Sequence, residues 1–153
     1  MAHLRRTRLS RESGFTLIEV LIVVLIIGIL AAIALPVFLS QRSSAHDADA
    51  KSNARSLASQ VELCFAPEED FRKCQTEDDI GDELGLPYGP GDGEVQVVTA
   101  GQKTYTITAR AAKPDENGVI HTFSIKRDLA GTTERICTAS NGDDNGGCNN
   151  GTW

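Results

Sequence analysis

The chain has 153 residues, which is enough for one domain with appended segments. Its 21 acidic residues outnumber its 15 basic residues and give a formal net charge of −6, so it is a poor electrostatic match for nucleic-acid phosphates, and no nucleic-acid partner is expected. The sequence contains no GxSxG, HExxH or Walker motif and no organised pair of catalytic carboxylates, so neither an enzyme nor a cofactor is expected.

A short basic leader opens the chain. Residues 1–14 carry one glutamate and four arginines and have a net charge of +3, which leaves −9 for the rest. The leader ends at Gly14, and a long apolar run begins at once with Phe15.

Residues 15–39 are apolar except for Thr16, Glu19 and the backbone break at Pro36. At about 1.5 Å per residue, a helix of this length crosses a hydrocarbon core of about 30 Å. The arginines before the run predict a cytoplasmic leader and an outward C-terminal part. A plain signal peptide has a shorter apolar region of about 7–15 residues. An uncut signal anchor explains the length and the charges, but it explains neither Glu19 nor the junction of Gly14 with Phe15.

This arrangement resembles the N-terminus of type IV pilins and of the related secretion pseudopilins. Gly14 supplies the small residue before the cleavage point, Phe15 the aromatic first residue of the mature chain, and Glu19 its fifth residue. Gly28 and Pro36 fall where the helix of the family often loosens. The resemblance implies cleavage by a prepilin peptidase, methylation of the new amine of Phe15, and a role for Glu19 in packing the filament. Family members often have tyrosine shortly after the proline, where this chain has Phe38.

Glu19 is the one ionisable side chain between Phe15 and Leu39. Burial in a helix bundle favours its neutral form unless a cation is near, and the cleaved amine of Phe15 on an adjacent subunit is the natural cation. Such a pair would set the axial register of otherwise smooth apolar helices. The alternative is an acid that only favours the first helical turn, where the helix dipole stabilises a negative charge.

Residues 40–66 predict an amphipathic continuation of the same helix. Apolar residues recur at a spacing of three to four on one face, while other faces carry polar residues. The apolar stripe is Ala50, Ala54, Leu57, Val61 and Phe65, and the residues assigned to the other faces are Asp47, Asp49, Lys51, Asn53 and Arg55. Ala66 and Pro67 predict a stop, so the helix is expected to run from near Phe15 to near Cys64.

Residues 67–153 predict a small globular head. A loop region over 67–93, with a short helix near 76–84, precedes strands expected over 94–99, 103–111, 119–127 and 134–139. Asn117 and Gly118 suit a tight hairpin turn. Alternation places Tyr105, Ile107 and Ala109 on one face, and places His121 with Phe123 and Ile125. His121 is therefore expected in the core or at its rim. Three or four antiparallel strands would pack on the helix stripe.

The four cysteines predict disulfides, because the head is expected outside the cytoplasm. The expected pairing is local, Cys64 with Cys74 and Cys137 with Cys148, which would close two short loops worth roughly 2–3 kcal/mol each. The alternative, Cys64 with Cys148 and Cys74 with Cys137, would tie the tail to the helix.

No metal site is expected, because the three histidines lie far from one another and from the cysteines. Asp143, Asp144 and Asn145 could ligate calcium, as in some pseudopilins, but their spacing does not match an EF-hand, and a solvated turn is the better interpretation. Residues 150–152 match a glycosylation sequon. Trp153 is expected to fold back on the head.

The expected fold class is α+β: a long N-terminal helix packed on a small antiparallel sheet. The expected organisation is a cleaved leader (1–14), a membrane-spanning and filament-core helix (15–39), its amphipathic outer half (40–66) and the head (67–153). The resemblance implies a homo-oligomeric type IV pilus filament, with a type II secretion pseudopilin, or a minor pilin that acts as a membrane-anchored binding module, as alternatives. It also implies a prepilin peptidase and methyltransferase, an assembly platform and the lipid bilayer as partners. The protein would lie in the cytoplasmic membrane before assembly and in the extracellular pilus afterwards.

Overall fold

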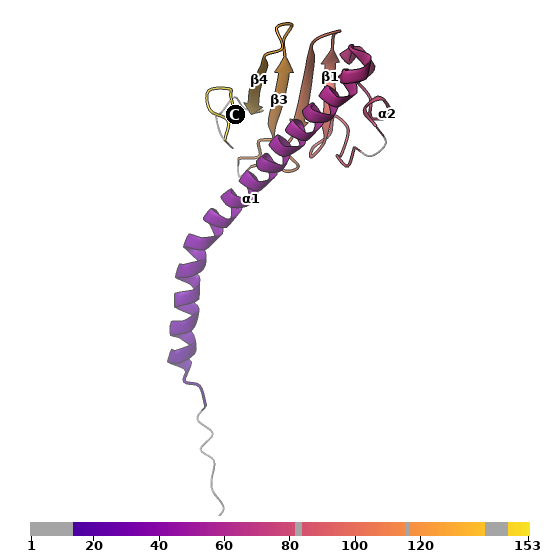
Figure 1. Cartoon of the computed structure of the whole chain (residues 1–153). Coiled ribbons are helices and arrows are strands. Elements are labelled where there is room, and N and C mark those ends of the chain that lie inside the picture. The colour runs from indigo at the N-terminus through magenta and orange to yellow at the C-terminus, as the bar shows by residue number, and fades with distance from the viewer. Residues whose placement is uncertain (1–13, 82–83, 116, 140–146) are drawn as a thin grey trace, which may run out of the picture. The chain divides into compact units, whose positions relative to one another are not determined.

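The computed structural model describes residues 14–81, 84–115, 117–139 and 147–153. The fold is α+β, as predicted, with one long helix and one antiparallel sheet (Figure 1). The described elements are α1 (Leu17–Glu68), the 3-10 helix η1 (Phe71–Lys73), α2 (Glu77–Ile80), β1 (Val95–Ala100), β2 (Tyr105–Arg110), β3 (His121–Arg127) and β4 (Thr133–Ala139). The chain divides into two compact units, one that ends at Val37 and one from Phe38 to Trp153.

The sheet of the second unit is an antiparallel meander in the order β1-β2-β3-β4, which gives four strands where three or four were expected. Ile107 of β2 pairs with Val97 of β1 and with Ile125 of β3. The register shifts between Val97 and Thr99, so β1 carries a bulge. Each strand lies next to the strand that follows it in sequence, as local hairpin connections favour.

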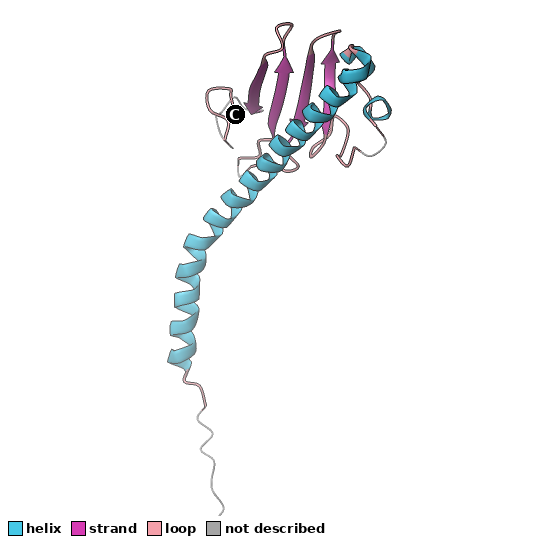
Figure 2. Ribbon diagram, viewed as in Figure 1, coloured by secondary structure: helices cyan, strands magenta, loops and turns pink. Residues whose placement is uncertain are grey.

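One face of the sheet packs against the part of α1 that belongs to the second unit (Figure 2). The predicted alternation is confirmed in β2, where Tyr105, Ile107 and Ala109 are buried, and in β3, where His121, Phe123 and Ile125 are buried. The predicted helix stripe is confirmed too, because Ala50, Ala54, Leu57 and Val61 are almost completely buried. Phe65, its last member, is only partly buried at the edge of the same core.

The predicted end of the long helix was wrong by about one turn. α1 continues through Ala66 and Pro67 to Glu68. A proline this close to the C-terminal end removes a single backbone donor, so the helix tolerates it. The chain leaves the helix at Glu69, whose φ of 52° is left-handed and whose amide donates to the carbonyl of Phe65 at 2.7 Å. The helix therefore ends through a left-handed residue after Glu68.

The short helix expected near residues 76–84 is smaller than predicted. α2 spans only Glu77–Ile80 and is held by a capping box, in which the Thr76 hydroxyl accepts from the Asp79 amide and the Asp79 carboxylate accepts from the Thr76 amide. Gly81 follows with a φ of 137°, a conformation that residues other than glycine rarely adopt, and the helix ends there.

The connection between β2 and β3 is wider than the tight hairpin predicted at Asn117 and Gly118. The strand ladder stops at the pair of Arg110 with Thr122. Gly118 does lie in a turn, with a φ of 79°, and its amide donates to the carbonyl of Asp115. The Asp115 carboxylate also accepts from the amides of Asn117 and Val119, each at 2.8 Å, so a side chain stabilises this loop where a tight hairpin would need none.

The C-terminal residue packs on the head, as predicted. The indole nitrogen of Trp153 donates to the carbonyls of Ser124 and Ile136, at 3.3 and 3.0 Å. The guanidinium groups of Arg55 and Arg135 lie 4.8 and 5.4 Å from the ring centroid. The last residues thus lie against β3 and β4.

Candidate functional site

The junction of Gly14 with Phe15 lies just before the first turn of α1. Residues 14–16 have no regular secondary structure, and Gly14 and Phe15 are both exposed. Thr16 caps the helix, because its hydroxyl accepts from the amide of Glu19 at 3.3 Å and its carbonyl accepts from the amide of Val20. The peptide bond between Gly14 and Phe15 is therefore accessible and lies outside the helix. The rest of the predicted leader lies outside the described residues.

Glu19 lies in the first turn of α1, four residues beyond Phe15. The alternative predicted for it, an acid that favours the helix N-terminus, is geometrically compatible with this position. The position does not conflict with a pairing role either, because the side chain is exposed and can meet a neighbouring molecule.

Residues 17–38 of α1 are exposed although nearly all of them are apolar. Among the described residues, α1 is the one helix long and apolar enough to cross a membrane, judged by length and composition. A surface of this kind requires either lipid or other apolar helices as its environment.

Gly28 and Pro36 both lie inside α1. A Cβ atom added at Gly28 would meet nothing within 4 Å, so no contact within this chain requires glycine there. Glycine in a helix interior costs roughly 1 kcal/mol relative to alanine. The loosening of the helix expected at Gly28 stays a prediction.

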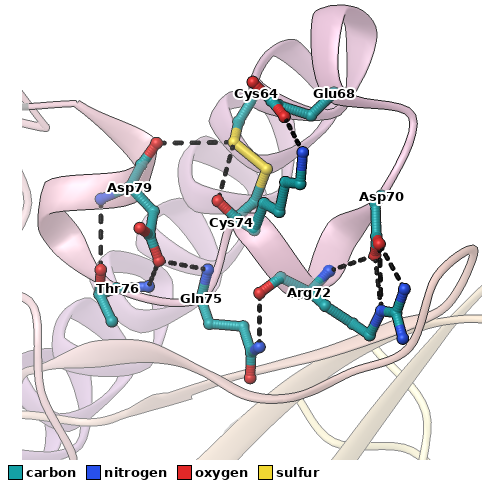
Figure 3. The surroundings of a disulfide bond; sticks show 9 residues. Cys64, Glu68, Asp70, Arg72, Cys74, Gln75, Thr76 and Asp79 are labelled. Carbon is teal, nitrogen blue, oxygen red and sulfur yellow. Dashed lines mark hydrogen bonds and ion pairs between the residues drawn. A yellow bond between two sulfur atoms is a disulfide. The ribbon is translucent and has the colours of Figure 1, made fainter.

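The disulfides of the structure join Cys64 with Cys74 and Cys137 with Cys148, which is the local pairing expected from the sequence. Figure 3 shows the first disulfide, which ties the last turns of α1 to the segment that follows η1. Asp70 caps η1 and accepts from the Arg72 side chain, which lowers the pKa of the Asp70 carboxyl (Figure 3). The second disulfide ties β4 to the C-terminal residues.

The prediction that Asp47 lies on a polar face of the helix was wrong, because its side chain is buried. Its carboxylate oxygens lie 2.9 and 3.0 Å from Nδ1 of His121, which is equally buried in β3. His121 is thus a core residue, as predicted, but one with a charged partner. Asp47 lies three residues before Ala50 and therefore on the same helix face, so the spacing alone predicts burial. The acidic residue type predicted a solvent face instead.

A second polar group joins α1 to the sheet near the other end of the core. Glu62 of α1 accepts a hydrogen bond from the Tyr105 hydroxyl at 3.1 Å and forms an ion pair with Arg127 of β3. Burial and the charge of Glu62 raise the pKa of Tyr105. The pairing of Glu62 with Arg127 could not be predicted from the sequence, because the two residues lie 65 positions apart.

No group of three or more His, Cys, Asp or Glu side chains that could hold a metal occurs in the part of the chain that the structure describes. The candidate calcium residues Asp143, Asp144 and Asn145 lie outside the described residues.

Comparison with known proteins identifies the class that these features define. The family model of the prokaryotic N-terminal methylation motif matches residues 9–35, the stretch that contains the cleavage junction, Glu19 and most of the apolar run. A type IV major fimbrial protein of Dichelobacter nodosus is 32% identical over 114 residues, which cover 74% of this chain and 72% of that protein. The chain belongs to the type IV pilin family.

Two further relatives differ in how far they match. The type IV major pilin protein of Myxococcus xanthus is 38% identical over 92 residues, which cover 56% of this chain but only 42% of that protein. The type II secretion system core protein G of Pseudomonas aeruginosa is 40% identical over 53 residues, which cover 35% of this chain and 37% of that protein. No solved structure matches the chain significantly.

Proposed function

We propose that this protein is a structural subunit of a type IV pilus, assembled through its apolar N-terminal helix after the leader is removed. The observation that carries the proposal is the uniformly exposed apolar surface of α1 over residues 17–38. Lipid covers such a surface before assembly, and the same helices of neighbouring subunits cover it in a filament.

Processing is the first step of the proposal. A prepilin peptidase cuts between Gly14 and Phe15, where the chain is exposed and not yet helical. The new amine of Phe15 is then methylated, and methylation of an amine keeps its positive charge. The accessible junction and the matched methylation motif support this step.

Glu19 then acts in assembly. It follows the new amine by four residues, about 6 Å along a helix. In a staggered bundle, the amine of one subunit reaches the carboxylate of its neighbour, and the pair offsets the cost of burying either charge. Apolar helices slide past one another at little cost, so this single polar contact sets the stagger.

The same arrangement implies the protein's surroundings. The precursor crosses the cytoplasmic membrane once, with the leader inside and the head outside. Its partners are further copies of this chain, the peptidase and methyltransferase, the membrane assembly platform and the lipid bilayer. After assembly, the protein belongs to the extracellular filament.

The decisive experiment replaces Glu19 by alanine in the full chain. Membrane insertion should persist, because removal of a charge makes insertion easier. Filaments counted by electron microscopy of sheared surface material should be few or absent, while mass spectrometry finds cleaved subunit in the membrane. Glu68→Ala is the matched control, since it removes an exposed glutamate of the same helix, whose ion pair among the described residues is with Lys73. Normal filament number in Glu19→Ala would overturn the pairing role.

A secretion pseudopilin is the second candidate. It is favoured by the match to the secretion core protein G, which is higher in identity but covers a shorter stretch than the match to the fimbrial protein. Long surface filaments composed mainly of this chain would support the pilus subunit. Short periplasmic assemblies, together with a secretion defect in a deletion strain, would support the pseudopilin.

A further inference from the structure

The imidazole of His121 lies between two carboxylates from different parts of the head. Nδ1 lies 2.9 Å from an oxygen of Asp47 on α1, and Nε2 lies 3.9 Å from an oxygen of Asp115 in the loop between β2 and β3. The ring and the Asp47 side chain are each only 2% exposed, and the Asp115 side chain is 7% exposed. All three groups are therefore largely withdrawn from water.

The two sides of the ring are not equivalent. Nδ1 has a partner at hydrogen-bond distance, whereas Nε2 has none among the described residues. A neutral imidazole has one N–H donor and one acceptor nitrogen. With its proton on Nδ1, the ring donates to Asp47, and its acceptor nitrogen then faces the carboxylate of Asp115. Two acceptors that face each other form no hydrogen bond, so the neutral ring can bind only one of the two carboxylates.

A protonated imidazole has a donor on both nitrogens. The gap between Nε2 and the Asp115 oxygen is about 1 Å longer than a charge-assisted hydrogen bond, which a small loop movement would close. Asp115 is ready to accept. Burial raises the pKa of its carboxyl, but hydrogen bonds from the amides of Val119 and Asn117, together with the charge of His121, outweigh burial and lower the pKa.

The remaining charged groups near the ring are few. From α1, Lys51 interacts with Asp47 and lies over the ring of Phe123, 4.7 Å from its centroid. On the neighbouring strand β4, the residue opposite His121 is the uncharged Ala139. Burial raises the pKa of Asp47, while the hydrogen bond and charge of His121 oppose that rise. Among the described residues, the balance around the ring thus consists of two carboxylates and one lysine.

We propose that His121 is a proton-operated clamp: when protonated it holds α1 through Asp47 and the β2–β3 loop through Asp115 together, and when neutral it holds α1 alone. Histidine normally changes charge within the physiological range. Acidification through that range therefore tightens the loop against the helix and the sheet. This device resides in the head and does not depend on the proposed role of Glu19.

Asp115→Asn is the sharpest variant. The asparagine oxygen can still accept from the amides of Asn117 and Val119, so the turn keeps its hydrogen bonds. Its amide group replaces the second oxygen by a donor, which the acceptor nitrogen of a neutral His121 can use. The variant should thus favour the neutral ring. Asp128→Asn is the matched control, because Asp128 accepts from the amide of Thr132 in the β3–β4 turn and caps that turn in the same way.

The test measures ring nitrogen-15 shifts of the full chain in detergent micelles, with the signal of His121 identified by its loss in His121→Gln. At one pH between about 5.5 and 7.5, wild type and Asp128→Asn should show the same fraction of rings with both nitrogens protonated. Asp115→Asn should show a neutral ring with its proton on Nδ1 and a ratio of protonated to neutral form lower by about tenfold.

A second readout follows the loop itself. Between about pH 7.5 and 5.5, hydrogen-exchange protection of the Asn117 and Val119 amides, corrected for intrinsic rates, should rise several-fold in wild type. It should stay constant in Asp115→Asn. A ring that stays neutral to about pH 5 in wild type, an unchanged ring in Asp115→Asn, or equal pH responses of the loop in the two proteins would each overturn the clamp.

Discussion

The hydroxyl of Tyr105 donates a hydrogen bond to Glu62 at 3.1 Å and so joins β2 to α1 across the core. The same carboxylate pairs with Arg127 of β3, whose guanidinium also lies over the ring of Phe71. One acidic side chain of α1 thereby anchors two strands. Removing it leaves a partly buried cation without its partner, which is the costly way to break such a group.

The first prediction concerns the ionisation of Tyr105. Burial, followed by the charge of Glu62, raises the pKa of this tyrosine above its ordinary value. The folded state therefore favours the neutral phenol, and the resulting stability is present below the unfolded pKa of about 10 and is lost as the pH rises above it. In Tyr88→Phe, Tyr105 is the remaining tyrosine, and phenolate absorbance should appear only above about pH 10.

Adding Glu62→Gln to Tyr88→Phe should move that absorbance change to lower pH, because the charge that opposes the phenolate is gone. An unchanged titration would show that burial alone controls Tyr105.

The second prediction concerns the helix stripe. Leu57 is completely buried, so Leu57→Ala should lower the free energy of unfolding by about 2–5 kcal/mol through lost burial and a residual cavity. Leu63 belongs to the same helix but is 70% exposed, so Leu63→Ala should change stability by no more than about 0.5 kcal/mol. Thermal unfolding of the full chain, followed by near-ultraviolet circular dichroism, measures both. Equal effects would contradict the assigned helix face.

The third prediction concerns the end of α1. Glu69 has a left-handed φ of 52°, a conformation that costs a non-glycine residue about 1–2 kcal/mol. Glu69→Gly removes this strain but adds chain entropy to the unfolded state, so a net gain of about 0.5–1 kcal/mol is expected. Glu68→Gly, one residue earlier and still helical, should instead destabilise by up to about 1 kcal/mol. The melting temperatures of the two variants should therefore move in opposite directions.

The fourth prediction concerns the C-terminal disulfide. Cys137 and Cys148 lie 11 residues apart, and the amide of Cys137 donates to the carbonyl of Gly151. Replacing both cysteines by serine should cost about 2–3 kcal/mol and release Trp153 from β3 and β4. The emission of this single tryptophan should then shift to the red, as its ring enters water.

The matched control replaces Cys64 and Cys74 by serine, because their loop spans 10 residues. It should destabilise by a similar amount and leave the native Trp153 emission in place. Peptide mapping without reduction should recover the two local pairs, and a peptide that joins Cys64 to Cys148 would contradict them.

The fifth prediction concerns the leader. Gly14→Arg should block cleavage, because a large charged side chain replaces the small residue beside the proposed cut. Intact-mass analysis should then find the uncut chain in the membrane. Gly28→Ala is the control, since a Cβ atom there has no neighbour within 4 Å, and it should be cleaved normally to begin at Phe15. Assembled wild-type protein that still carries Met1 would contradict the proposed processing.

The long N-terminal helix could be predicted from the sequence because its signals are local. Residues 17–38 are exposed throughout, so no distant contact modifies the helix that their composition predicts. The strands of the head were predicted for a related reason. Alternation at Tyr105, Ile107 and Ala109 reports directly which side of a strand is buried, and the structure confirms that face.

The tertiary structure decided what depends on partners far along the chain. The sequence predicts that Asp47 faces solvent, whereas in the fold it is buried beside His121, which lies 74 residues away in the chain. The sequence predicts that the helix stops before Pro67, whereas the last turn of α1 contains this proline. The sequence by itself determined the long helix, its apolar half and the face that covers the sheet, because the spacing of apolar residues along the chain predicts which side of a helix is buried. Only the folded head determined which buried charges meet, because a buried charge is stable only where a specific partner offsets its desolvation.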